Sequence, residues 1–126
     1  MVVASMLGKK EVETILAEIM DTIPELEGII TASNTGKVVA GQTLREMDHG
    51  AIVTSILMLL KESKAVSKSV DQGTAQVIYL ETDKGYTVAI TASKALVVAI
   101  AGKDAAASLG LIIRSLRAAI DKITAL

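Results

Sequence analysis

The segment AIVTSILMLL, from Ala51 to Leu60, is more apolar than a helix packed on one sheet requires. At about 100° per residue its apolar side chains cover nearly half of the helix circumference, and Thr54 and Ser55 are its only polar residues. A helix on a single sheet needs an apolar stripe of only about 100°. The excess predicts a second apolar partner, and the simplest candidate is the same helix of a second copy. The alternative is a monomer with an unusually hydrophobic central helix.

Chain length and composition narrow the classes of protein to which this chain can belong. A chain of 126 residues is long enough for one domain, which we expect to span residues 1–126. The absence of cysteine excludes disulfides and thiolate metal sites, and it fits a reducing cytoplasm. The net charge of -1 gives no global field that would favour nucleic acid or an anionic membrane.

The chain also lacks the sequence features of membrane insertion and export. Its longest apolar run is far shorter than the roughly 18 residues that a membrane-spanning helix needs. An export signal has a basic segment before its apolar residues, and the starting sequence MVVASMLG has none. We therefore expect a soluble, cytoplasmic protein that has no transmembrane segment and does not bind nucleic acid.

Apolar periodicity and turn residues predict the order of helices and strands. The predicted helices lie at 11–23, at 49–68 and after Asp104, and the predicted strands lie at 28–33, 37–42, 75–82, 86–91 and 95–101. Asp48 and Asp104 each precede a helix, where a carboxylate can accept hydrogen bonds from free amides as an N-cap. Turn residues at 34–36 and 83–85 predict two hairpins, and 92–94 links the last two strands.

The faces of the predicted strands indicate the architecture. The last strand, ALVVAIA, is apolar on both faces, which predicts a position at the centre of the sheet. A sheet that is apolar on both faces needs helices on both sides. Because hairpins join neighbouring strands, most of the sheet should be antiparallel. The sequence therefore predicts an α/β fold, a three-layer α/β/α sandwich with a five-stranded, mostly antiparallel sheet.

A search for catalytic and metal-binding patterns finds none that is specific. No glycine-rich loop ends in the Gly-Lys-Ser/Thr pattern that wraps phosphates in backbone amides. His49 is the only histidine, and we interpret it as a first-turn helix residue rather than a metal ligand or a catalytic base. Asp48 is explained by capping, so its proximity to Glu46 does not make a carboxylate pair for acid–base chemistry. The sequence predicts no cofactor and no metal site.

Arginines are few in this chain. Arg45, Arg114 and Arg117 are the only ones, and no motif favours any of them as an arginine finger. Arg114 and Arg117 share an exposed side of the predicted last helix, with Asp121 nearby. This cluster is either a solvated face or a partner-binding patch.

Several short structural patterns, none of them catalytic, follow one another along the chain. They are Leu26-Glu27-Gly28-Ile29-Ile30, Thr35-Gly36-Lys37-Val38-Val39-Ala40, Val77-Ile78-Tyr79-Leu80-Glu81 with Gly85-Tyr86, and Leu109-Gly110-Leu111-Ile112 leading to Leu116-Arg117. In this order and spacing the chain resembles the roadblock/LC7 domain family over nearly its whole length. That family often has an acidic residue in the first hairpin turn, where this chain has Asn34 and Thr35. The difference leaves the turn chemistry intact.

The resemblance implies a homodimer of the profilin-like or roadblock-like fold. Proteins of this family pair their third strands edge to edge and pack their second helices together. In this chain the pairing strand would be 74–81 and the twinned helix 51–64. The residues that the resemblance places at the dimer interface are Ile52, Val53, Ile56, Leu57, Leu60, Lys64, Thr74, Gln76, Ile78 and Leu80.

The resemblance also implies a partner, because such dimers serve as platforms for small Ras-like GTPases. The candidate GTPase-binding residues are Thr54, Met58, Lys61 and Ala65. The expectation is a non-catalytic scaffold or regulator that acts by ordering the GTPase's own switch segments. The alternative is a small-ligand-sensing module of profilin-like shape, although the chain has few of the aromatic and convergent polar residues of such pockets. We do not expect an enzyme.

Overall fold

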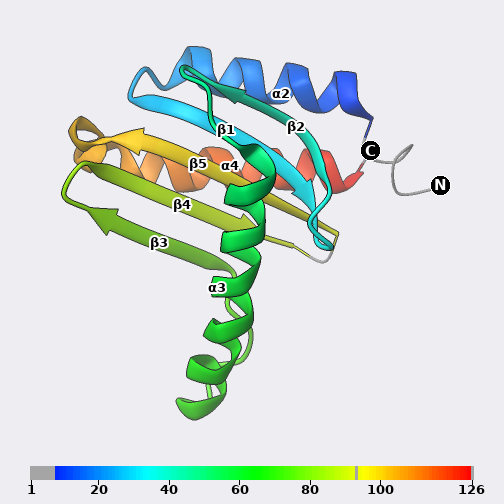
Figure 1. Ribbon diagram of the computed structural model, residues 1–126, viewed down its shortest axis with the longest axis vertical. Coiled ribbons are helices and arrows are strands. Elements are labelled where there is room, and N and C mark those ends of the chain that lie inside the picture. The colour runs from blue at the N-terminus through cyan, green and yellow to red at the C-terminus, as the bar shows by residue number, and fades with distance from the viewer. Residues whose placement is uncertain (1–7, 93, 126) are drawn as a thin grey trace.

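A five-stranded sheet with helices on both faces forms the body of the molecule (Figure 1). This computed structural model describes residues 8–92 and 94–125. In chain order its elements are α2 (Lys9–Thr22), β1 (Leu26–Ser33), β2 (Val38–Thr43), α3 (His49–Ser69), β3 (Val77–Thr82), β4 (Gly85–Thr91), β5 (Ala95–Gly102), the 3-10 helix η1 (Lys103–Ser108) and α4 (Leu109–Ala125). The export prediction was based largely on residues 1–7, which lie outside the described residues, as does Ser93 in the predicted link at 92–94.

The strand order confirms the predicted sheet. The order is β2-β1-β5-β4-β3, and every neighbouring pair is antiparallel. β5 is the predicted ALVVAIA strand and lies in the centre, with every residue buried except the half-buried Ile100. β2 and β3 are the two edge strands, and α3 is the crossover that connects them.

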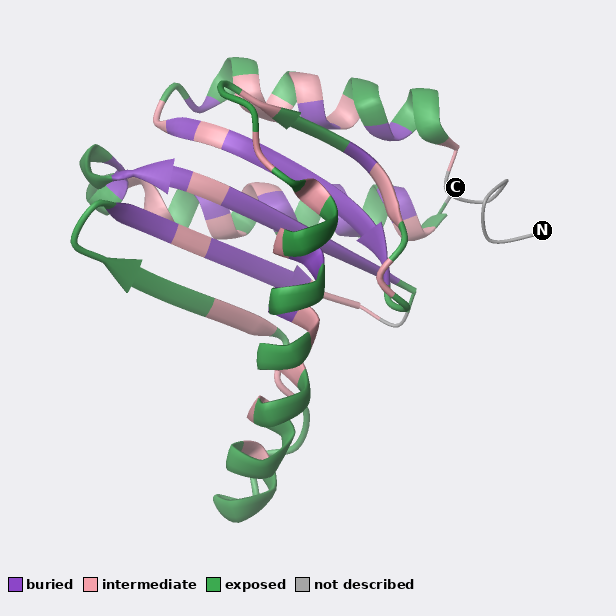
Figure 2. Cartoon of the chain, viewed as in Figure 1, coloured by how far each residue is buried: buried purple, intermediate pink, exposed green. Residues whose placement is uncertain are grey.

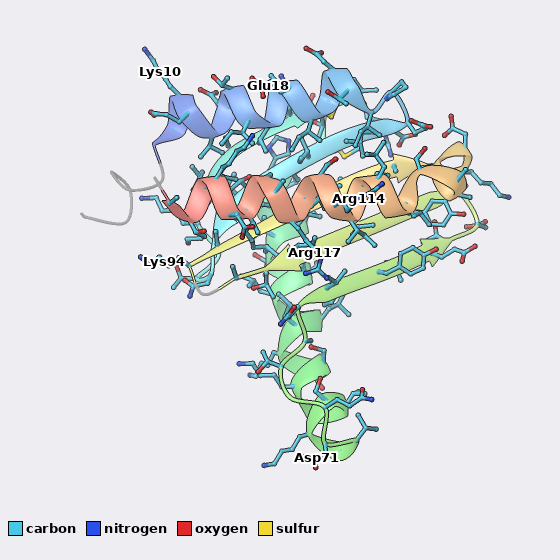
Figure 3. All side chains as sticks on the ribbon, turned by 180° about the vertical axis from the view of Figure 1, so that it is seen from behind. Lys10, Glu18, Asp71, Lys94, Arg114 and Arg117 are labelled. Atoms are coloured by element: carbon cyan, nitrogen blue, oxygen red, sulfur yellow. The ribbon has the colours of Figure 1, made fainter. Side chains whose placement is uncertain are left out.

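The two faces of the sheet carry different helices, as the two-sided apolar strands predicted. α2 and α4 cover one face, where they run side by side (Figure 3). The core under them includes Leu16, Ile29, Val97, Ile112 and Leu116. α3 lies on the other face, over β1 and β2, where Val53 and Ile56 pack in a core with Ile30, Leu96 and Val98. The C-terminal half of α3 runs past the β3 edge of the sheet (Figure 1).

The two predicted helix caps have different outcomes. Asp48 is confirmed as the N-cap of α3, because its side chain accepts a hydrogen bond from the Ala51 amide at 3.0 Å. The prediction for Asp104 is wrong, because Asp104 lies inside η1, whose N-cap is Gly102, and α4 begins only at Leu109. Ala105 is fully buried, so the chain forms a tight 3-10 turn against the core before α4 begins at Leu109.

The predicted boundaries of β3 and of the second hairpin also need correction. β3 begins at Val77 rather than at residue 75. Gly85 pairs with Thr82 as the first residue of β4, so the turn itself consists of Asp83 and Lys84. A β-carbon on Gly85 would collide with the carbonyl oxygen of Ala101 on β5. Close approach of two strands, and not turn geometry, therefore requires glycine here.

The membrane prediction can be tested only on the described part of the chain. Within residues 8–92 and 94–125, no helix combines the length and the apolar character needed to cross a bilayer.

Candidate functional site

The outer edge of β3 presents backbone groups that no strand of the described sheet uses. Alternate residues of an antiparallel strand direct both their N–H and their C=O toward the same neighbour. The amide of Thr91 donates to the carbonyl oxygen of Gln76 at 3.1 Å, so the even-numbered residues of β3 bond toward β4. Val77, Tyr79 and Glu81 therefore direct their backbone groups away from the sheet. Such an edge is a template for pairing with another chain.

The side chains of β3 are also incompletely covered. Tyr79 is 46% exposed and Leu80 is 45% exposed, and they lie on opposite faces of the strand. The Tyr79 ring stacks on Tyr86 of β4, with ring centroids 5.9 Å apart. Desolvation and the neighbouring Glu81 carboxylate raise the pKa of Tyr79. The phenol therefore stays protonated at neutral pH. Because Tyr79 and Leu80 lie on opposite faces, the strand exposes uncharged surface on both of them.

The second half of α3 adds to this surface. Met58 is 64% exposed and Val66 is 65% exposed. Figure 2 shows the helix as mostly exposed over the length that extends beyond β3. Among the described residues, six of the eight strongly exposed large apolar side chains belong to α3, to its C-cap or to β3. These six, which we call the β3–α3 surface, are Met58, Leu59, Val66, Val70, Tyr79 and Leu80.

The residues that the sequence placed at a dimer interface fall into three groups. Val53 and Ile56 are buried against the sheet of their own chain, so they belong to its core and not to an accessible interface. Thr74 and Gln76 precede β3, because the strand begins at Val77. The remaining predicted residues are half-buried or exposed along α3 and β3, and they are Ile52, Leu57, Leu60, Lys64, Ile78 and Leu80.

The four residues predicted to contact a GTPase lie on one side of α3. Thr54, Met58, Lys61 and Ala65 follow one another at spacings of four, three and four, and all are exposed. Residues at these spacings share one face of a helix. The structure therefore brings them together as one stripe that points away from the sheet.

Sequence reasoning missed part of the β3–α3 surface. Tyr79, Leu59, Val66 and Val70 were not among the predicted site residues, although all four are exposed. Val66 and Val70 are four residues apart in an otherwise polar stretch, and Leu59 is seven residues before Val66. This helical spacing of apolar residues was the signal that could have identified them.

Two hollows, each of about 500 Å³, lie on either side of the chain segment that precedes β3. One is lined by residues of α3 and the segment, including Leu57, Lys61 and Lys64. The other is lined by the segment, by Ile90 of β4 and by Arg117 and Asp121 of α4. Within the described ranges, no cluster of three or more His, Cys, Asp or Glu side chains could hold a metal ion.

His49 has a local structural role at the start of α3. It is the first residue of the helix, as predicted, and its ring lies against Gly41 of β2. Its Nε2 is 3.3 Å from the Thr43 hydroxyl oxygen, which is a hydrogen-bonding distance. These contacts join the helix to the edge strand β2.

The fold matches known structures although the sequence does not. No protein-family model matches the chain, and no curated protein matches it in sequence. The gliding protein MglB of Thermus thermophilus superposes with a TM-score of 0.80 at 14% identity, over 91% of this chain and 87% of that one. An MglB with a tetrameric arrangement gives 0.82 at 13% identity, over 91% and 86%. A roadblock/LC7 domain from Streptomyces avermitilis gives 0.74 at 16% identity, over 87% and 92%. The chain therefore has the roadblock/LC7 fold.

Proposed function

We propose that this protein, acting as one domain, is a homodimeric, non-catalytic regulator or scaffold that binds a small Ras-like GTPase. The observation that carries the proposal is the β3–α3 surface, a group of exposed apolar side chains on α3 and on both faces of β3, beside an unpaired strand edge. Exposed apolar surface concentrated in one region marks interaction sites. The MglB and roadblock/LC7 folds of the similar structures support the choice of partner.

A second copy of the chain is the occupant that best fits the β3–α3 surface. Pairing two β3 edges about a two-fold axis would satisfy the outward backbone groups of both chains. Because α3 extends past β3, its exposed half would reach over the seam to the second copy (Figure 1). Each large apolar side chain that becomes fully buried contributes about 1.5 to 3 kcal/mol. Several such side chains would offset the entropy lost on association.

The GTPase would bind on the side of α3 that points away from the sheet. Thr54, Met58, Lys61 and Ala65 are exposed there, and dimerisation would bring two such stripes together. The stripe includes one cation and two apolar side chains but no carboxylate or arginine. We therefore assign it a binding role in which the GTPase supplies its own catalytic groups.

The first experiment tests self-association. Size-exclusion chromatography with light scattering should report a dimer at micromolar concentration. Leu80→Asp should convert it to a monomer, because a charge would be buried at the seam. Leu111→Asp is the matched control, since Leu111 is 43% exposed but lies on α4. A wild-type monomer, or equal effects of the two variants, would count against the dimer.

The second experiment tests the partner. Candidate Ras-like GTPases encoded by the same organism would be loaded with GDP or a GTP analogue and titrated into the protein. We expect at least one to bind with nucleotide-dependent affinity, and Lys61→Glu to weaken that complex without changing the dimer. Failure of every candidate in both nucleotide states would remove the GTPase proposal.

One hollow favours the ligand-sensing alternative. The hollow beside α3 has a volume of about 500 Å³ and is lined by Lys61 and Lys64 together with Asn34, Ser63 and Thr74. This volume lies within the range of small-molecule pockets. A melting shift with metabolites, in the absence of any GTPase complex, would support this second function.

A further inference from the structure

The hollow beside α4 contains an arginine with no acidic partner. Arg117 lines it together with Ala75, Gln76 and Ile90, at the point where β3 begins. Asp121 lies one helical turn further along α4 and lines the same hollow. In the part of the chain that the structure describes, Arg117 forms no ion pair. Figure 3 shows Arg117 on α4 beside the strands β4 and β3.

The acidic residue of β3 lies at the other end of the same strand face. Val77, Tyr79 and Glu81 alternate onto the face that α4 covers, because side chains of a strand alternate. Glu81 lies four positions after Val77 along the extended strand, which is a distance of about 13 Å. Glu81 therefore lies far along the strand from the hollow that Arg117 lines in its own subunit.

The backbone of β3 selects one register for a symmetric pair. Val77, Tyr79 and Glu81 are the residues of the strand whose backbone groups point outward. A two-fold axis at Tyr79 pairs Tyr79 with its own copy and Val77 with Glu81 of the partner subunit. This register uses the outward groups of all three residues in both chains. If the axis shifts by one residue, one of these three residues faces a position of the partner subunit that lies outside β3.

This register places the carboxylate of Glu81 of the partner subunit near Arg117. Directly opposed residues of paired strands have β-carbons about 4.5 to 5.5 Å apart and share a face. Glu81 of the partner subunit would then lie beside Val77, whose cross-strand neighbour Ile90 lines the hollow with Arg117. A guanidinium can bind a carboxylate through two parallel hydrogen bonds.

We propose that Arg117 of one subunit binds Glu81 of the partner subunit, and that this pair, formed twice, sets the register of the β3–β3 seam. The inference rests on the proposed homodimer and adds to it a specific reason why one copy recognises another. Two like charges at this position would repel each other and oppose pairing of the strands. The ion pair therefore helps to select the second subunit as well as to attract it.

Charge reversal gives a test that does not depend on a double variant. Arg117→Glu alone places two carboxylates together at both sites of its homodimer, and Glu81→Arg alone places two guanidiniums together. Each should weaken self-association about tenfold or more, as measured by sedimentation equilibrium. An equimolar mixture of the two single variants should form heterodimers of near wild-type affinity, because both pairs then have opposite charges. Arg114→Glu and Glu18→Arg, on exposed sites of α4 and α2, are the matched controls and should have little effect.

A cross-linking measurement tests the register by itself. The chain has no cysteine, so Tyr79→Cys introduces a single thiol that can form only an intersubunit disulfide. Opposed residues at the two-fold axis are about 5.5 Å apart at Cα, within the range of a disulfide. Tyr79→Cys should cross-link readily under mild oxidation, whereas Leu80→Cys should not.

The outcomes separate this inference from the proposed function. A wild-type dimer whose single variants associate normally, or whose mixture fails to recover, would overturn the ion pair while the dimer stands. Preferential cross-linking of Leu80→Cys would overturn the register. A wild-type monomer would overturn both proposals. Circular dichroism of each variant checks that the exposed substitutions leave the fold intact.

Discussion

At the scale of single residues, Thr31 stands out because its buried hydroxyl makes no hydrogen bond to the described residues. It lies in β1 between Ala40 of β2 and Val97 of β5, both of which belong to the core under α2 and α4. Thr31 is fully buried, and its hydroxyl has no hydrogen-bond partner among the described residues. A buried hydroxyl without a partner costs free energy because it has lost its bonds to water. No sequence pattern identified this position, since threonine is common in both buried and exposed strands.

Replacing this hydroxyl with a methyl group should therefore stabilise the protein. We expect Thr31→Val to raise the free energy of unfolding by about 1 kcal/mol, measured by urea denaturation. Thr31→Ala is the control, because it also removes the hydroxyl but leaves a cavity, and it should be less stable than Thr31→Val by about 1 to 3 kcal/mol. If Thr31→Val were no more stable than the wild type, the hydroxyl would have a partner such as a buried water.

At the scale of helices and strands, the sequence predicted the elements that follow from a repeating apolar pattern. It did not predict those that depend on a single tertiary contact. The central position of β5 and the helix cover on both sides followed from strands that are apolar on both faces, which is a property of the chain itself. The 3-10 turn η1 could not be predicted, because it depends on Ala105 packing against a core that is assembled from distant elements. The start of β3 at Val77 likewise depends on pairing with Ile90 of β4.

The candidate site shows the same division between local pattern and tertiary contact. Periodicity predicted that α3 carries excess apolar surface, and Met58 is indeed exposed. It could not say which apolar residues the chain would cover for itself, so Val53 and Ile56 were placed at an interface although the sheet buries them. The hollow around Arg117 combines residues from β4, α4 and the segment before β3, a combination that only the fold creates.

One contact between elements makes the stability depend on pH. The Ser108 hydroxyl at the end of η1 donates to Glu25 Oε2 at 2.7 Å and joins residues far apart in the chain. This hydrogen bond, followed by one from the backbone, lowers the pKa of Glu25 from its ordinary value of 4.5. A carboxyl whose pKa is lower in the folded state stabilises the fold above its unfolded pKa. That stabilisation is lost as the pH falls through the folded pKa.

Removing the donor should therefore matter most when Glu25 is ionised. We expect Ser108→Ala to unfold at a lower urea concentration than the wild type at pH 7. The difference should shrink as the pH is lowered from 4.5 through the folded pKa of Glu25. Glu25→Gln is the control, and in that background Ser108→Ala should show no such pH dependence. A difference that stays constant with pH would mean that the serine acts only through packing.

At the scale of the subunit, the sheet and helices leave the outer edge of β3 and the C-terminal half of α3 uncovered. The α2–α4 face is closed by two helices, whereas α3 alone packs on the other face, mainly over β1 and β2, and then extends beyond the β3 edge. In the proposed dimer the two β3 edges would join the sheets into one, and the two α3 helices would lie together near the axis. A surface built in this way belongs to neither subunit alone. Loss of the dimer should therefore also abolish GTPase binding.

Symmetry then determines how many GTPase molecules one dimer can hold. The stripe formed by Thr54, Met58, Lys61 and Ala65 runs along α3, and in the dimer its two copies would flank the two-fold axis. A partner that contacts both stripes must lie across the axis, where it excludes a second partner by steric overlap. We therefore expect isothermal titration calorimetry to report one GTPase per two subunits, and Leu80→Asp to abolish the heat of binding. A ratio of one GTPase per subunit, retained in Leu80→Asp, would place the binding site within a single subunit and away from the axis.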